Sequence, residues 1–220
     1  MQREATFFGS SIGKKVVMAV SGLVLLGFVI GHMIGNLQIY LGADALNEYA
    51  EFLRHMLHGQ GIWLARGGVL LAVALHIWAA TSLTLGNWAA RPIGYRQTQA
   101  RESTYASRTM VWSGPILAAF IVYHLAHLTL GSAHPEFIAS DVYRNVVIGF
   151  LNPFASAFYI LAMLALGLHM YHGLWSMLQT LGLSHERWNP WRRGIALAVA
   201  AVVVIGNISI PVAVLTGYVR

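Results

Sequence analysis

The stretch VVMAVSGLVLLGFVIGHMIGNL, from Val16 to Leu37, contains 22 residues and no Asp, Glu, Lys or Arg. A helix needs about 20 consecutive apolar residues to cross the hydrocarbon core of a bilayer. Four further stretches are similar in length and nearly as apolar, and they cover residues 62 to 85, 109 to 130, 154 to 178 and 194 to 215. The sequence therefore predicts an all-α integral membrane bundle of five transmembrane helices.

The composition of the 220 residues agrees with a chain that lies mostly in lipid. Hydrophobic residues make up 57% of the sequence and charged residues 10%, whereas soluble domains carry about 25% charged residues. The chain contains no cysteine, which excludes disulfides, thiolate zinc sites, cysteine-held iron–sulfur clusters and covalent c-type haem. We expect residues 1 to 220 to form a single transmembrane domain.

The loops on one side of the membrane are expected to contain two short helices, at about 44 to 58 and 136 to 150, that lie in the interface. Asp44 can cap the first of them. Asn152 and Asn189 each precede a proline, which predicts that they cap the fourth and fifth spans. No internal repeat is evident along the chain.

The basic residues are distributed unevenly between the loops. Ten of the 14 lysines and arginines lie before the first span, between the second and third spans, or between the fourth and fifth. Cytoplasmic loops carry an excess of Lys and Arg, so we expect the N-terminus in the cytoplasm and, after five crossings, the C-terminus outside. Because topology explains the basic charge, no nucleic-acid partner is expected.

Imidazoles are the main ionisable groups within the spans. All eight acidic residues lie outside the spans. Six histidines lie within them: His32, His76, His124, His127, His169 and His172. Ionisable residues inside a membrane indicate a functional site; the alternative for any one of them is a neutral histidine that hydrogen-bonds a neighbouring helix.

The depths of four histidines predict two pairs. His32 and His124 lie past the middle of outward-running spans and therefore in the outer half of the membrane. His76 and His169 lie past the middle of inward-running spans, in the inner half. At a rise of 1.5 Å per residue, the two levels differ by roughly 10 Å.

Two facing imidazoles at each level favour a haem iron held between two neutral histidines. Zinc requires more ligands than either level supplies. A glycine stripe, Gly27, Gly31 and Gly35, is compatible with a flat slot beside His32, although such stripes usually pack helices. His127 and His172 each follow another histidine by three residues and share its helix face, so either member of each couple can be the ligand.

These residues resemble the cytochrome b membrane-anchor subunit of bacterial succinate dehydrogenase, in its five-helix, two-haem form. The similar segments are GHMIGNL around His32, ALHIWAA around His76, VYHLAHLTLG around His124 and LHMYHGLWSML around His169. The loop segment ARPIGY and the run YASRTM are also similar. The resemblance implies that His32 and His124 bind an outer haem b, and that His76 and His169 bind an inner one.

The resemblance further implies a place in a respiratory complex of the bacterial cytoplasmic membrane. Flavoprotein and iron–sulfur subunits would dock on the cytoplasmic face, and the succinate-oxidising site would be on another subunit. The chain would carry electrons between the iron–sulfur subunit and a membrane quinone, expected to be menaquinone. Residues expected near the haems or quinone are His127, His172, Ser21, Asn36, Arg91, Arg108 and Glu51. A membrane glutamate that some fumarate-reducing relatives carry two residues before the fourth-span ligand is replaced here by Gly167.

Several alternative functions share some of these features. The chain could be the equivalent subunit of a quinol:fumarate reductase, because the direction of electron flow depends on potentials. It could also be the cytochrome b of a formate dehydrogenase or hydrogenase. A non-redox alternative is a haem-free transporter or scaffold, which would contain no b-type haem.

Overall fold

The computed structural model describes residues 6–90 and 105–220 and contains only helices, turns and irregular segments there. Five of its helices are long and apolar enough to cross a membrane. They are α1 (Ser11–Asn36), α3 (Gln60–Ala89), α4 (Tyr105–His124), α6 (Pro153–Thr180) and α7 (Asn189–Leu215). A π-helical turn, η3 (Leu125–Thr129), continues α4. The prediction of an all-α, multi-pass membrane protein is confirmed.

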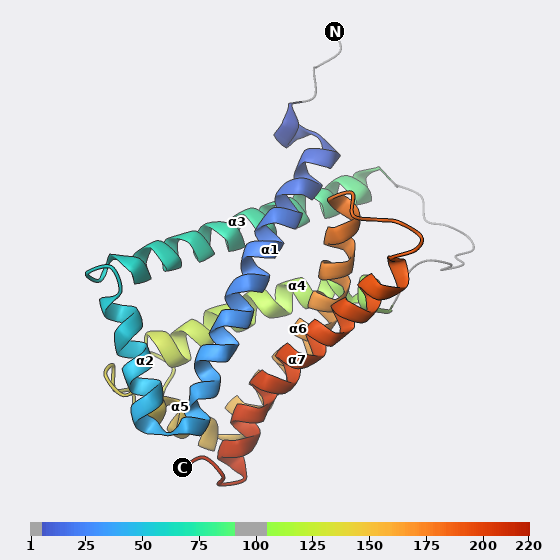
Figure 1. The fold of residues 1–220 in the computed structure, drawn as a ribbon. Helices are drawn as coiled ribbons and strands as arrows, with labels where there is room; N and C mark the ends of the chain where they lie inside the picture. Colours follow the sequence, from blue (N-terminus) through green and yellow to red (C-terminus); the bar gives the residue numbers. More distant parts are fainter. Residues whose placement is uncertain (1–5, 91–104) are drawn as a thin grey trace.

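The long helices pack in a defined order (Figure 1). α1 packs against α3, α4 packs against α6, and α6 also packs against α7. α1 makes a smaller contact with α6. Among the described elements, α3 packs mainly against α1 and to a smaller extent against the short helix α2 (Ala43–His55). The bundle therefore consists of an α1–α3 pair beside an α4–α6–α7 group.

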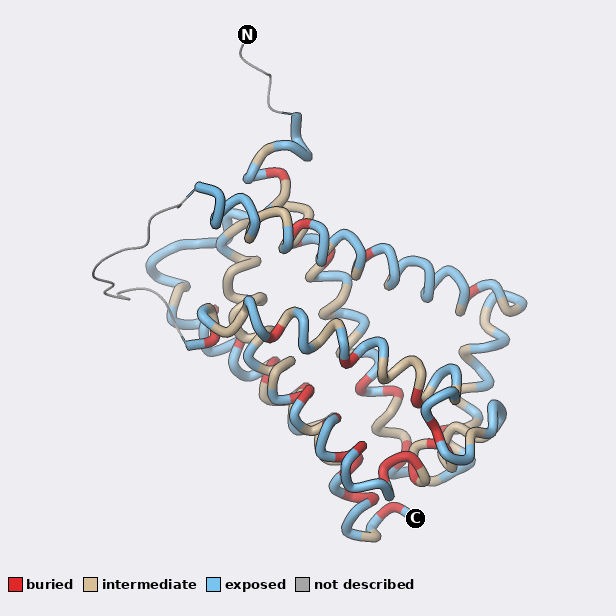
Figure 2. The backbone as a smooth tube through the Cα atoms, turned by 180° about the vertical axis from the view of Figure 1, so that it is seen from behind, coloured by how far each residue is buried: buried red, intermediate tan, exposed pale blue. Residues whose placement is uncertain are grey.

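The most buried part of the bundle lies toward the end where the chain terminates (Figure 2). The largest cluster of buried apolar residues comes from α2, α4, α6, α7, the C-terminal segment, the 3-10 helix η2 (Leu37–Leu41) and the short helix α5 (Val142–Leu151). A second, smaller cluster joins Met33 on α1 to Met170 on α6 and Val203 on α7. Large apolar side chains elsewhere on the long helices are exposed, as expected where helices face lipid.

The predicted helix starts were partly correct. Asn152 caps α6, because its side chain accepts hydrogen bonds from the backbone N–H groups of Phe154 and Ala155. The prediction for Asn189 was wrong: it is the first helical residue of α7, and its side chain accepts from the Arg192 guanidinium instead. Asp44 likewise lies within the first turn of α2, and no side-chain cap precedes this helix.

The two short helices are shorter than predicted. α2 ends at His55, because Leu57 and His58 adopt positive φ angles of 52° and 56° that a helix cannot continue. The helix expected from residue 136 starts only at Val142. The segment before α5 is irregular. Its Ile138 backbone forms two hydrogen bonds, of 2.9 and 2.6 Å, with the side chain of Asn145 on α5.

The start of α5 is fixed from two sides. Asp141 caps this helix by accepting from the Arg144 backbone N–H at 3.0 Å, and it also accepts from the Asn47 amide on α2 at 3.0 Å. The side-chain amide oxygen of Asn47 (Oδ1) in turn accepts from the Tyr143 backbone N–H at 3.0 Å. These bonds join α2 to α5, which the sequence alone did not predict.

Candidate functional site

The first pair of histidines joins α1 to α4. The ring centroids of His32 and His124 lie 5.8 Å apart, and the ring planes are at 88°. Each imidazole also has an aromatic neighbour one helical turn earlier. Phe28 stacks on His32 at 5.3 Å, and Phe120 lies 5.7 Å from His124. The depths of these histidines in the sequence predicted this pairing.

The second pair joins α3 to α6. The ring centroids of His76 and His169 lie 6.1 Å apart, with the planes at 58°. The Nδ1 atom of His169 lies 3.2 Å from the Ser113 hydroxyl on α4. The Nδ1 atom of His76 lies 3.3 Å from the Ser21 hydroxyl and 3.2 Å from the Met18 carbonyl oxygen on α1. These partners engage Nδ1 and leave Nε2 of each ring available as a ligand.

The serine contacts define a structural repeat of spacing and contacts, which the absence of a repeat in the residue letters does not contradict. Ser21 precedes His32 by eleven residues, and Ser113 precedes His124 by the same number. In each half, the serine of the first long helix hydrogen-bonds the histidine of the second, His76 or His169. The order of a long helix, a short helix and a long helix also recurs, as α1–α2–α3 and α4–α5–α6. The repeat is one of spacing and contacts rather than of residue identity, so comparison of letters does not find it.

The glycine stripe on α1 has two different environments. A Cβ atom built on Gly27 or Gly31 would meet nothing within 4 Å, whereas one on Gly35 would overlap the Tyr49 ring. On α6, Gly173 also faces open space, but a Cβ atom on Gly167 would lie 2.6 Å from Val204 on α7. Only Gly35 and Gly167 therefore serve helix packing here. Gly27, Gly31 and Gly173 pack against no neighbouring side chain.

His127 lies beside the His32–His124 pair and is not paired with a ring on α1. Its side chain is 2% exposed, and its Nδ1 atom lies 3.1 Å from the Tyr159 hydroxyl on α6. The same hydroxyl lies 3.3 Å from Nδ1 of His124. His134, from the loop before α5, lies 5.2 Å from the His127 ring.

Tyr159 and His134 were not predicted as site residues. Tyr159 precedes His169 by ten residues on the same helix, which corresponds to about 15 Å along the axis. If depths had been estimated from the rise per residue for all polar residues of the spans, and not only for the histidines, Tyr159 would have been placed near the depth of His124. His134 belongs to an irregular loop, so no periodicity could have located it.

The other expected neighbours are spread along the bundle. His172 lies on α6 beside Trp175, with ring centroids 6.1 Å apart. His172 Nδ1 and Trp175 Nε1 are buried and have no hydrogen-bond partner in the described chain. Arg108, in the first turn of α4, is exposed, and Asn36, at the end of α1, is half-buried. Glu51 on α2 is exposed, 3.8 Å from His55. Arg91 lies outside the described residues.

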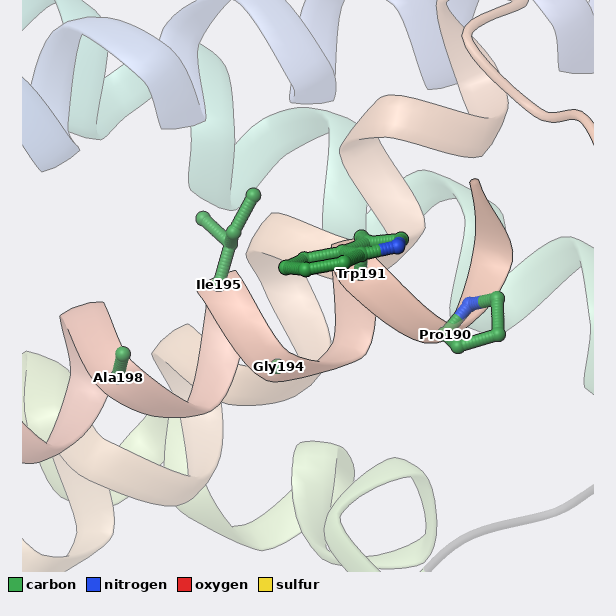
Figure 3. Close-up of a pocket in the computed structure, with 5 residues that line it drawn as sticks. All are labelled: Pro190, Trp191, Gly194, Ile195 and Ala198. Atoms are coloured by element: carbon green, nitrogen blue, oxygen red, sulfur yellow. The ribbon is translucent and has the colours of Figure 1, made fainter. Parts of the chain in front are cut away.

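The surface pockets do not coincide with the histidine pairs. An apolar pocket of about 390 Å³ lies along the start of α7 and is lined by Pro190, Trp191, Gly194, Ile195 and Ala198 (Figure 3). A smaller one of about 210 Å³ lies between the start of α1 and the end of α3. None of the residues that line them is a histidine. Within the described ranges, no three or more His, Asp or Glu residues gather into a metal site.

The spacing of each pair suits one metal ion held between two Nε2 atoms. Two metal–nitrogen bonds of about 2 Å, with about 1.1 Å from each nitrogen to its ring centre, separate the centroids by about 6 Å. The observed values are 5.8 and 6.1 Å. Each pair can therefore supply two histidine ligands to one metal ion.

Residues 89–208 match the model of the succinate dehydrogenase/fumarate reductase transmembrane subunit family. The chain belongs to this family. The matched region includes α4, α5, α6 and most of α7, and with them one histidine of each pair, His124 and His169. No curated protein and no solved structure gives a significant match to the chain. Membership in this family agrees with the multi-pass architecture, because its members are transmembrane subunits.

Proposed function

We propose that this protein is the cytochrome b membrane-anchor subunit of a succinate dehydrogenase and carries electrons through two b-type haems. The observation that supports this most directly is the presence of two pairs of neighbouring imidazoles. The ring centroids lie 5.8 Å apart in the His32–His124 pair and 6.1 Å apart in the His76–His169 pair. His32 with His124, and His76 with His169, would be the axial ligands. A haem with two histidine ligands has no open position, so it supplies one-electron transfer rather than oxygen binding.

The chain's own residues would orient these ligands. With iron at Nε2, Nδ1 of His169 would carry the proton and donate to the Ser113 hydroxyl, and Nδ1 of His76 would be engaged by Ser21 together with the Met18 carbonyl. A hydrogen bond at the second ring nitrogen fixes the tautomer and rotation of a ligating imidazole. Ser21 therefore supports the inner ligand in this proposal and is not a quinone contact.

The inner pair would lie closer to the cytoplasm. The excess of basic residues in three loops supports a cytoplasmic N-terminus and an outer C-terminus. Within the 220 residues there is no cysteine to hold an iron–sulfur cluster, so a separate iron–sulfur subunit, itself reduced by a flavoprotein, would deliver the electrons. The membrane would be the bacterial cytoplasmic membrane, and residues 1 to 220 would act as one dihaem domain with α2 and α5 in the interface.

A quinone, which we expect to be menaquinone, would accept these electrons. His172 Nδ1 and Trp175 Nε1, three and six residues beyond His169 on α6, are buried polar atoms without a hydrogen-bond partner in the described chain. Such atoms are costly to bury unless they bind something. They are available for a haem propionate or a quinone oxygen, as are the buried and unpartnered Nε and Nη1 atoms of Arg192 on α7. The Arg193 guanidinium lies 4.9 Å from the Trp175 ring.

The test is purification of the intact complex through a tag on this chain, followed by haem quantification and subunit identification. We expect two b-type haems per chain and co-purification of a flavoprotein and an iron–sulfur protein. A complex without haem would contradict the proposal and favour a haem-free transporter or scaffold. Co-purification of a different catalytic subunit would favour a formate dehydrogenase or hydrogenase.

The equivalent subunit of a quinol:fumarate reductase is the second candidate, because the family description includes both enzymes. The two activities use the same electron path in opposite directions. Membrane vesicles would be assayed for succinate-dependent quinone reduction and for quinol-dependent fumarate reduction. A faster forward reaction with menaquinone at equal substrate saturation supports the dehydrogenase, and a faster reverse reaction supports the reductase.

A further inference from the structure

The hydroxyl of Tyr159 lies between two imidazoles of the same helix face. It is 3.3 Å from Nδ1 of His124 and 3.1 Å from Nδ1 of His127. A phenol carries one proton, so it can donate to only one of these nitrogens. The other nitrogen must then donate to the phenolic oxygen, which gives the three groups a fixed direction.

The proposed function decides that direction, and this inference rests on it. If His124 binds iron through Nε2, its Nδ1 atom carries the proton and donates to the Tyr159 oxygen. Tyr159 then donates its own proton to Nδ1 of His127. His127 is therefore the final acceptor in a series of two hydrogen bonds that begins at His124.

His127 is held in place for this role. Its ring stacks on Tyr123 at 5.3 Å and is 2% exposed. A Cβ atom on Gly149 would lie only 2.8 Å from Cε1 and 2.9 Å from Nε2 of His127. Glycine at this position of α5 lets the ring approach the α5 backbone, so His127 cannot turn away from Tyr159 without displacing its neighbours.

The loop before α5 closes the other side of the His127 ring. His134 accepts from the Glu136 backbone N–H at Nδ1, at 3.0 Å, and its Nε2 atom donates to the Asn145 carbonyl oxygen at 2.8 Å. His134 is therefore a neutral imidazole in a fixed tautomer. It packs against His127 without competing for the Tyr159 hydroxyl.

The repeat in the fold provides no equivalent on α1. The residue three positions after His32 is Gly35, and the position that corresponds to Tyr159, ten residues before His76, is Arg66. Arg66 instead lies 5.0 Å from the Trp63 ring. The chain of hydrogen bonds thus acts on one axial ligand of one haem.

We infer that Tyr159 and His127 are positioning residues that lower the midpoint potential of the haem bound by His32 and His124. Donation from Nδ1 raises the basicity of a ligating imidazole, and a more basic ligand favours ferric over ferrous iron. Tyr159 is a stronger acceptor when it donates its own proton onward, because linked hydrogen bonds polarise one another. Removal of either residue is expected to raise this potential.

The experiment is redox titration of both haems in the intact complex carrying Tyr159→Phe, His127→Leu or both substitutions. We expect each single variant to retain two haems and to raise the potential of the His32–His124 haem, with the larger shift in Tyr159→Phe. The double variant should match Tyr159→Phe, because His127 acts through that hydroxyl. The potential of the His76–His169 haem should not change in any of them.

His127→Gln provides the rescue, since its carbonyl oxygen can accept from Tyr159, and it should restore a potential close to that of the original protein. An unchanged potential in Tyr159→Phe, which removes a single oxygen, overturns the inference even if His127→Leu does not accumulate. Additive shifts in the double variant also overturn it. Two haems with an insensitive potential contradict this inference alone, whereas an unsubstituted complex without haem contradicts the proposed function.

Discussion

The Ser113 hydroxyl on α4 lies 3.2 Å from Nδ1 of His169 on α6 and so determines which nitrogen of that ring can face His76. Ser21 has the corresponding role in the other half of the repeat, 3.3 Å from Nδ1 of His76, but there the Met18 carbonyl oxygen is a second partner at 3.2 Å. The two histidines of one level are therefore held by serines of the two helices that supply the other level.

This difference predicts unequal effects of two serine substitutions. Ser113→Ala removes the side-chain hydrogen-bond partner of His169 and should weaken binding of the inner haem by about 10- to 100-fold, the range found for such supporting groups. Ser21→Ala should have a smaller effect, because His76 keeps the Met18 carbonyl. Haem content measured during stepwise detergent dilution checks both. Equal losses in the two variants would contradict the explanation.

The pairing predicts which haem each ligand substitution removes. His76→Ala and His169→Ala should each leave one haem per chain, and the same haem should remain in both. His32→Ala and His124→Ala should leave the other. Low-temperature difference spectra and ferric paramagnetic resonance distinguish the two haems. Loss of different haems in His76→Ala and His169→Ala would refute the pairing.

The histidines three residues after the ligands should not be ligands themselves. His172→Ala should retain both haems, because no imidazole of another helix pairs with it in the described chain and its nearest aromatic neighbour is Trp175. His127→Ala should also retain both haems, since His127 contacts Tyr159 rather than the α1 ring. A pyridine haemochrome assay gives the count. If only one haem remained in His127→Ala or His172→Ala, the substituted histidine would be the ligand in place of His124 or His169.

Gly149 predicts a stability effect at the His127 contact. Gly149→Ala would bring a methyl group to 2.8 Å from His127 and 3.3 Å from His134. Overpacking of this kind costs about 1–3 kcal/mol, so the melting temperature in detergent should fall. Gly68→Ala on α3 is the control, because nothing lies within 4 Å of its added Cβ atom. A similar melting temperature for both variants would contradict the packing argument.

Asp141 predicts a pH effect outside the membrane spans. The Arg144 backbone N–H and the Asn47 amide donate to Asp141 and hold the pKa of its carboxyl below the usual value. Because this pKa is lower in the folded than in the unfolded protein, the ionised carboxylate stabilises the fold at pH values above the unfolded-state pKa of about 3.9. This stabilisation is lost as the pH falls through the folded-state pKa.

Asp141→Asn should keep the helix cap and remove this titration, so its melting temperature should fall less than that of the original protein between pH 6 and pH 3. Asp141→Ala should additionally lose about 1 kcal/mol at neutral pH, the usual cost of removing an N-cap. Thermal unfolding across this pH range measures both. An identical pH dependence in the original protein and Asp141→Asn would contradict the role of the carboxylate.

The sequence by itself determined the five long helices and the levels of their histidines. Apolar length is a local property of the chain, and the rise per residue converts position along a span into depth. His32 and His124 could therefore be matched in depth, as could His76 and His169, before any packing was known. The Asn152 cap was also predicted from adjacent residues, although the same Asn–Pro pattern gave a wrong prediction at Asn189.

Only the tertiary structure decided what each ring contacts. Rotation of a helix about its axis and the identity of its neighbours depend on packing between segments far apart in the chain. That packing brings Ser113 to His169 and Tyr159 to both His124 and His127, and it separates the open Gly27 and Gly31 from the packed Gly35. Depth is set along one helix at a time, whereas a hydrogen bond needs the correct depth and the correct face on two helices at once.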